Sequence, residues 1–181
     1  MVGLWCEVME SIECLQGNGP EDVMDIVYYL GEIALHLAGE QNPRGRLKSS
    51  IEDGSALEKF RQMVIAHGGS LSSLDNPETH KPIFRQLVRS KTDGYISFMD
   101  TKSLGMAVVH LGGGRLQKKD ELDPTVGILI HKKVGDSVYA DEPIMEYFCS
   151  DKDKYESSKL YFKDAIQIES ELPEPIKLIY K

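Results

Sequence analysis

The sequence predicts an α+β protein in which an N-terminal helical segment is followed by a mostly β domain that also carries a helix. Three observations support this prediction. Apolar residues recur at helical spacing through the first 70 residues, residues 70–82 are rich in Ser, Asp, Asn and Pro, and the later apolar runs are short and bounded by Gly, Asp and Pro. We therefore expect a helical part at 1–69, a linker at 70–82 and a second domain at 83–181.

The first two helices are expected to form a hairpin. Apolar residues between positions 7 and 16 share one face, and this helix ends at Gly17. The second helix begins at Pro20, which suits a first helical turn, and stops near Gly39. It has the clearest apolar stripe in the sequence, formed by Val23, Ile26, Val27, Leu30, Ile33, Ala34 and Leu37. If this stripe is buried, truncation of Leu30 to alanine should cost on the order of 2–5 kcal/mol.

Two further helices are predicted before the linker. One follows Asn42-Pro43 and runs to about residue 53. The Ser-Ala-Leu-Glu sequence at 55–58 has the spacing of a capping box, which predicts the start of another helix that stops at the glycines 68–69.

Short strands dominate the remainder. We expect strands at 94–99, 106–111, 126–131 and 144–149, a charged helix at 152–164, and a last strand at 165–168 before a Pro-interrupted tail. Residues 134–144 have the turn-strand-turn rhythm of a barrel-sandwich hybrid such as a lipoyl or biotinyl carrier. A carrier needs a modifiable lysine at the tip of a hairpin, and no lysine stands in that context, so the β part is expected to be barrel-sandwich-like without being a carrier.

Composition excludes several classes of function. The 181 residues have a formal net charge of −8, so there is no overall basic surface for nucleic acid. No apolar run approaches the roughly 20 residues of a membrane span, which predicts a soluble protein with no membrane partner. The three cysteines are widely spaced and form no C-x-x-C pair, which favours a reducing cytoplasm over a disulfide framework or a zinc site.

No complete catalytic constellation is present, and the five histidines are scattered. The run Gly112-Gly113-Gly114-Arg115 leaves two interpretations open. It could bind an anion through main-chain N–H groups and the guanidinium, or it could form a tight turn between strands that Arg115 anchors. The acidic residues Glu7, Glu10 and Glu13 recur every three positions, which is typical of a solvated helix face and, alternatively, could provide a cation ligand.

Two stretches resemble one protein family. Residues 1–22 are similar to the V-G-N-A-L-E-V-x-E-A-I-E-x-L-x-G-x-G-P-x-D segment of pyrimidine-nucleoside and thymidine phosphorylases, and L-G-G-G-R at 111–115 with I-L-I-H-K-K-V-G-D at 128–136 resembles that family's L-G-A-G-R and V-L-H-K-K-I-G-D signatures. The resemblance spans essentially the whole chain and covers the C-terminal portion of a family enzyme. It departs where Leu4-Trp5-Cys6 replace Asn-Ala-Leu, and where a usual glycine is replaced near 140–141.

The resemblance implies a cytoplasmic, homodimeric glycosyltransferase of nucleotide salvage, whose intact form converts a pyrimidine nucleoside (thymidine or uridine) and phosphate to free base and pentose 1-phosphate. It places the catalytic, phosphate-binding and base-binding residues upstream of residue 1, so the chain alone is expected to be an inactive scaffold, with the N-terminal portion or a second copy as its partner. The resemblance implies that no cofactor is required. The resemblance implies a potassium site using Glu10, and a cleft-closing contact at Gly112, Gly113, Gly114 and Arg115. The alternative is a stand-alone, non-catalytic barrel-sandwich binding module.

Overall fold

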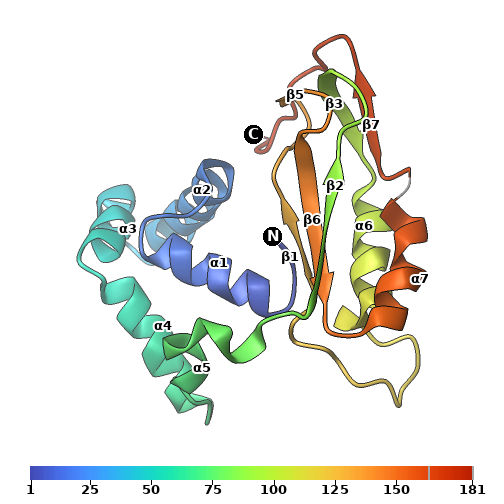
Figure 1. Cartoon of the computed structure of the whole chain (residues 1–181). Helices are drawn as coiled ribbons and strands as arrows, with labels where there is room; N and C mark the ends of the chain where they lie inside the picture. Colours follow the sequence, from blue (N-terminus) through green and yellow to red (C-terminus); the bar gives the residue numbers. More distant parts are fainter. Residues whose placement is uncertain (163, 181) are drawn as a thin grey trace. The chain divides into compact units, whose positions relative to one another are not determined.

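The computed structural model describes residues 1–162 and 164–180, and its helices and antiparallel sheets confirm the α+β prediction (Figure 1). The chain divides into two compact units. One consists of Met1–Glu7 and His80–Ile176, and the other of Val8–Thr79 with the residues from Lys177 onward. The domain limits expected from the sequence stay a prediction.

The unit that begins at Val8 is helical. The predicted helices are present with small shifts of their ends: α1 (Trp5–Leu15), α2 (Glu21–Leu37), α3 (Pro43–Glu52) and α4 (Ser55–Ala66). The expected linker also contains helical turns, α5 (Ser72–Asp75) and the 3₁₀ turn η1 (Pro77–His80).

The helix starts have different caps. The Asn42 side chain accepts a hydrogen bond from the Gly45 N–H at 3.2 Å, which caps α3 as its Asn-Pro start suggests. The predicted capping box at 55–58 is wrong, because Gly54 occupies the N-cap position of α4. Asp53 Oδ1 instead accepts the Ser55 N–H at 2.9 Å, in a tight Asp-Gly-Ser turn.

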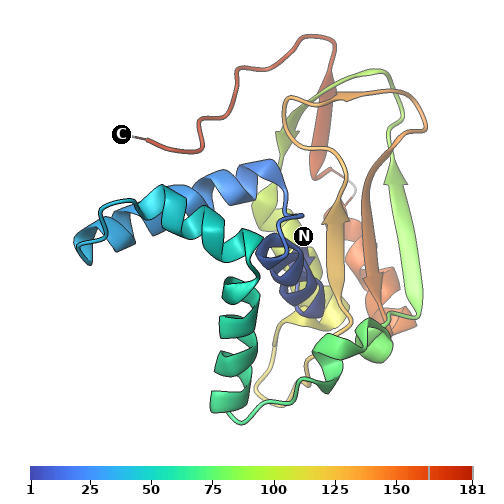
Figure 2. The same ribbon diagram turned by 90° about the vertical axis from the view of Figure 1, so that its left-hand side faces the viewer.

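The apolar stripe of α2 is exposed within this unit. Figure 2 shows α2 and α3 side by side, and Gly31 allows this approach, since a Cβ there would lie 2.9 Å from the Leu47 side chain. Packing through Gly31 leaves the stripe uncovered, with Leu30 59% exposed. The exposed residues of the stripe are Val27, Leu30, Ile33, Ala34 and Leu37.

The other unit contains two antiparallel sheets. The larger has the strand order β1-β4-β6-β2 and the smaller β5-β3-β7, and in the described residues neither closes into a barrel. The strands are β1 (Val2–Gly3), β2 (Phe84–Arg89), β3 (Gly94–Met99), β4 (Gly127–Ile130), β5 (Ser137–Val138), β6 (Pro143–Cys149) and β7 (Ile166–Glu169).

Two helices, α6 (Thr101–Val108) and α7 (Lys152–Phe162), cover one face of the larger sheet (Figure 1). The core lies between them and β4 and β6. Its fully buried members include Leu111, Ile128 and Met145, with the stacked rings of Tyr147 and Phe162 4.1 Å apart. This layer holds the end of α6, where the glycine run lies.

The strand predicted at 106–111 is wrong. Asp100 Oδ1 accepts the N–H groups of Lys102 and Ser103 at 3.1 Å, which starts α6, and the helix continues as one π-helical turn, η2 (Val109–Gly113). The adjacent β-branched residues Val108 and Val109 favour a strand locally. Burial of one helix face against the sheet overrides that preference.

A strained position lies in the turn before β6. Asp141 has φ +67°, the one positive φ among the described residues other than glycine, and its N–H donates to the Ser90 carbonyl at 2.9 Å. We expect Asp141→Val to lower the free energy of unfolding by about 1–2 kcal/mol, because a β-branched residue is disfavoured in this left-handed conformation. Asp141→Gly should stay within about 0.5 kcal/mol of the parent in the same urea titration. Equal stability of both variants would contradict the strain.

Among the described residues, no helix is both long enough and apolar enough to cross a membrane.

Candidate functional site

The glycine run Gly112–Gly114 terminates a helix instead of joining two strands. Gly112 has φ +113°, which ends the helical backbone of η2, and a Cβ on Gly113 would lie 2.7 Å from Val108 Cγ1. The chain can therefore turn sharply at this point only because these side chains are absent. The predicted turn exists, but a helix precedes it.

Arg115 does not anchor this loop. It is exposed, and it forms no hydrogen bond or ion pair with the residues that the structure describes. Asp120 takes the anchoring role instead, since its Oδ2 accepts the N–H groups of Leu116 at 3.0 Å and Gln117 at 2.8 Å. The guanidinium of Arg115 is therefore available to another surface.

Asp123 ties the loop to the sheet. Its backbone N–H donates to the Gly112 carbonyl at 2.9 Å, while its carboxylate accepts the Thr125 hydroxyl at 2.6 Å and the Ser150 N–H at 3.0 Å. Because this carboxylate accepts hydrogen bonds from two segments of the chain, it fixes the loop relative to the end of β6. We did not predict this contact from the sequence, although Asp-Pro-Thr is a recognisable side-chain-to-backbone turn.

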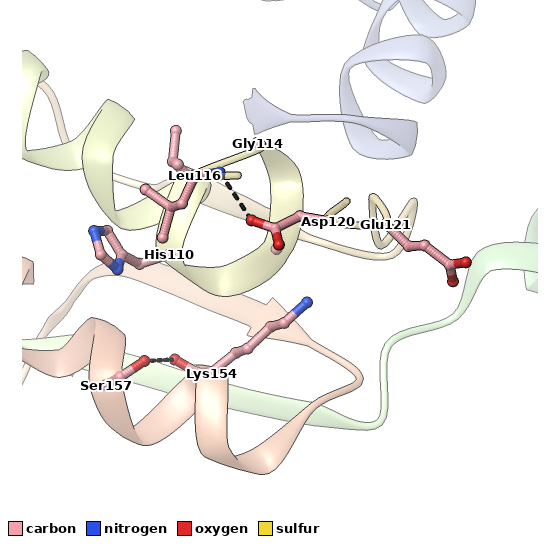
Figure 3. A pocket seen from close by; sticks show the side chains of 9 residues that line it. His110, Gly114, Leu116, Asp120, Glu121, Lys154 and Ser157 are labelled. Atoms are coloured by element: carbon pink, nitrogen blue, oxygen red, sulfur yellow. Dashed lines mark hydrogen bonds between the residues drawn. The ribbon is translucent and has the colours of Figure 1, made fainter. Parts of the chain in front are cut away.

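The loop, the end of α6 and α7 line an open pocket of about 350 Å³. Figure 3 shows the Lys154 side chain extending from α7 toward the loop that carries Asp120. The Lys154 ammonium forms no ion pair with the described residues, and it lies 3.0 Å from where a Cβ on Gly112 would be. The lining residues are Val109, His110, Gly112, Gly114, Leu116, Asp120, Glu121, Lys154 and Ser157.

An aromatic pair fixes one wall of this pocket. The His110 and Tyr161 rings stack with centroids 4.6 Å apart, and the Tyr161 hydroxyl is 2.7 Å from His110 Nε2. His110 therefore joins the end of α6 to α7. His110 Nε2 is engaged by Tyr161. The Ser157 hydroxyl in the same pocket donates to the Lys154 carbonyl at 2.9 Å, so among the described residues the structure pairs no nucleophile with this ring.

The cysteine near the loop, Cys149, is fully buried. Burial raises the pKa of the Cys149 thiol, and the nearby Asp123 and Asp151 charges add to this effect. The thiol donates to the Asp151 carbonyl at 3.2 Å. A protonated, buried thiol is not an attacking group at neutral pH.

Glu10 lies on α1 in the helical unit, apart in the sequence from the glycine loop, which belongs to the other unit. A hard cation takes about six to eight oxygen ligands, and Glu10 supplies one carboxylate. In the described part of the chain, no three His, Cys, Asp or Glu side chains gather where they could hold a metal. The side chains near Glu10 therefore do not by themselves form a cation site.

The pocket combines one lysine, two carboxylates and glycine backbone, which suits contact with a polar group or another protein segment.

Comparison with known proteins shows which family has a domain similar to the one that contains this pocket. Residues 95–169 match the pyrimidine nucleoside phosphorylase C-terminal domain, which includes the whole glycine loop and Lys154.

Curated relatives match nearly the full chain. The pyrimidine-nucleoside phosphorylase of Bacillus subtilis (strain 168) is 36% identical over 99% of this chain, and those of Staphylococcus haemolyticus and Geobacillus stearothermophilus are 34% and 32% identical over the same share. In each case the match covers 42% of the relative, so the chain spans less than half of their length.

Proposed function

Because this chain belongs to the pyrimidine-nucleoside phosphorylase family, with its match in the C-terminal portion, we propose that it serves as the C-terminal part of such an enzyme. The intact enzyme would transfer a pentose from a pyrimidine nucleoside to phosphate, releasing the free base and a pentose 1-phosphate. The observation that carries this proposal is the match to the curated phosphorylases over 99% of the chain.

The role proposed for this part is support and closure, not chemistry. Transition-state stabilisation of phosphate and a developing sugar cation requires several converging cationic and N–H donors. The glycine-loop pocket contains a single lysine beside two carboxylates. Arg115, exposed beside this pocket, is the residue that we propose contacts another part of the enzyme when the active-site cleft closes.

The first test is activity of the chain alone. We expect no measurable release of thymine or uracil from thymidine or uridine with phosphate, because loss of even one oxyanion donor costs roughly 10²–10³ in rate. Base release followed by absorbance, against a heat-inactivated control, checks this. Turnover by the purified chain alone would overturn the scaffold role.

Complementation then tests the closing contact. Supplying the remaining portion of the Bacillus subtilis relative should restore base release, since the exposed α2 stripe would regain a partner surface. Arg115→Ala should lower the restored rate, while Lys118→Ala, an exposed cation of the same loop, should leave it unchanged. An equal loss of the restored rate in both variants would mean that the positive charge of the loop matters in general, and that Arg115 makes no specific contact.

A second candidate is a stand-alone binding module without transferase chemistry. The α+β unit with its own buried core favours it. Size-exclusion chromatography separates the two: a monomer that recruits no phosphorylase portion supports the module, whereas association through the exposed helical face supports the enzyme part. A homodimer and a cytoplasmic location stay proposals, and the three cysteines form no disulfide.

Potassium belongs to this proposal as a property of the intact enzyme. We expect weak or no potassium binding by the chain alone, since one carboxylate is far from a full oxygen shell. Thermal denaturation with potassium against a large organic cation measures this. A potassium-dependent rise in Tm that Glu10→Ala abolishes would show that the chain holds a site by itself.

A further inference from the structure

The Asn18-Gly19 pair lies in the short connection between α1 and α2. We propose that Asn18 is a deamidation site of the folded chain, at which an aspartyl or isoaspartyl residue forms without an enzyme. The three asparagines of the sequence are Asn18, Asn42 and Asn76. Asn18 differs from the other two in its hydrogen bonds and in the residue that follows it.

The reaction needs a free backbone nitrogen next to a free side-chain amide. The Gly19 nitrogen, on losing its proton to solvent base, attacks Asn18 Cγ, and the new C–N bond closes a five-membered succinimide as the side-chain nitrogen leaves as ammonia. Water then adds to one of the two ring carbonyls. Hydrolysis gives aspartate if the new bond between Cγ and the Gly19 nitrogen breaks. It gives isoaspartate if the original peptide bond between the backbone carbonyl carbon of residue 18 and the Gly19 nitrogen breaks.

The geometry meets both requirements. Asn18 is exposed, and its side-chain amide makes no hydrogen bond with the described residues. The Gly19 N–H also has no acceptor in the described part of the chain, and glycine has no Cβ to hinder the attack. The Asn18 N–H donates to the Glu13 carbonyl at 2.9 Å, and Gly19 packs against Cys14, where a Cβ would lie 2.5 Å from Sγ. Neither contact occupies the Gly19 N–H or the Asn18 side-chain amide.

The other two asparagines are protected twice. Each precedes a proline, Pro43 or Pro77, whose nitrogen carries no N–H to lose. Each side chain is also occupied, because Asn42 Oδ1 accepts the Gly45 N–H at 3.2 Å and Asn76 Oδ1 accepts the Glu78 N–H at 3.3 Å. They are internal controls within the same molecule.

A similar Asp-Gly sequence is held differently. At Asp53-Gly54 the glycine N–H donates to the Ile51 carbonyl at 3.2 Å, and Asp53 Oδ1 accepts the Ser55 N–H. Hydrogen bonding of both groups withholds the nucleophile and fixes the carboxylate. We therefore expect isoaspartate to accumulate at position 18 and not at position 53.

The product changes the connection between α1 and α2. Either form adds one negative charge two residues before the N-cap Pro20, which takes the formal net charge from −8 to −9. The isoaspartyl form also lengthens the backbone between the two helices by one carbon atom. It creates a free α-carboxylate of the chemical class that isoaspartyl-specific carboxyl methyltransferases methylate.

The test is incubation of the full folded chain at mildly alkaline pH, followed by peptide mass spectrometry and by methyl transfer from S-adenosylmethionine with an isoaspartyl methyltransferase. We expect conversion at Asn18 within about tenfold of the rate in guanidinium-unfolded chain, because an exposed turn opens at almost no free-energy cost. Asn42 and Asn76 should stay intact, and Asn18→Gln should remove the methyl-accepting product.

Two results would overturn the proposal. One is an unmodified Asn18 in the folded chain while the unfolded chain reacts, which would mean that the turn is rigid. The other is equal conversion at Asn42 or Asn76, which would mean that hydrogen bonding and proline do not select the site. Neither readout depends on the phosphorylase proposal.

Discussion

Leu111→Ala is expected to lower the free energy of unfolding by about 2–5 kcal/mol, the range for a leucine truncated in a close-packed core. Leu111 is 0% exposed and lies on η2, where it packs with the buried residues of α6, β4 and β6 beneath the glycine loop. The cavity left behind would be lined on the sheet side by fully buried residues of β4 and β6, such as Ile128 and Met145. Collapse around it would therefore recover little of the lost contact.

Urea unfolding followed by Trp5 fluorescence measures this effect, because Trp5 is the one tryptophan of the sequence and belongs to the same unit as Leu111. A loss below about 0.5 kcal/mol would contradict the burial of this side chain.

Leu30→Ala is the matched comparison. The sequence pattern predicts a buried Leu30, whereas the structure leaves it 59% exposed, so the expected loss falls below about 1 kcal/mol. Far-UV circular dichroism reports it, since Leu30 lies in the helical unit. A loss as large as that of Leu111→Ala would mean that a second copy of the chain covers the α2 face in solution, which dilution would reverse.

The α2 helix also illustrates what a sequence can predict. Its 3.6-residue periodicity and its Pro start predict where the helix forms. The apolar stripe does not specify which surface, if any, covers it. Which face is covered depends on Gly31 and Leu47, a contact between two helices that no local pattern encodes. The sequence therefore predicts that the α2 helix forms, but it does not predict whether the apolar stripe of this helix is buried.

The sheet unit shows two further limits. The short apolar run 106–111 between two glycines predicts a strand, but burial of one helix face against the sheet makes it helical. The edge strand β2 was missed because Arg85 and Gln86 interrupt its apolar alternation. Edge strands carry such polar residues routinely, so the signal is weak by nature.

The site divides in the same way. Gly112–Arg115 was identified from glycine density and from the family resemblance, both of which are local. Lys154 was missed because it reaches the loop from α7, a distant part of the chain. Asp123 has a local Asp-Pro-Thr signal, but its hydrogen bond from the Ser150 N–H is non-local. Only the fold brings α7 over η2, so no spacing rule could have found the lysine.

Gly112→Ala is expected to be the most disruptive small substitution at this site. A φ of +113° lies beyond even the left-handed region that L-residues visit, so an alanine must either strain or move the backbone, at a cost on the order of 1–3 kcal/mol. The added Cβ would also lie 3.0 Å from Lys154 Nζ. Since a lysine tip is flexible, the backbone strain should outweigh this contact.

Gly105→Ala provides the opposite expectation in the same segment. Gly105 lies inside α6, and a Cβ there meets no atom within 4 Å, so alanine should raise the free energy of unfolding by about 0.5–1 kcal/mol. Comparing the two variants by Trp5 fluorescence in urea separates the effect of backbone conformation from that of adding a methyl group. Equal and small effects in both would mean that the η2 turn is not constrained to glycine.

The double variant Gly112→Ala with Lys154→Ala then identifies the cause of the loss. If strain dominates, truncating Lys154 leaves most of the destabilisation in place, because the positive φ is unchanged. If the contact dominates, the double variant recovers most of the stability relative to Lys154→Ala alone, with a coupling of about 0.5 kcal/mol or more. Such recovery would contradict the strain argument and would make Lys154 the residue that requires glycine at position 112.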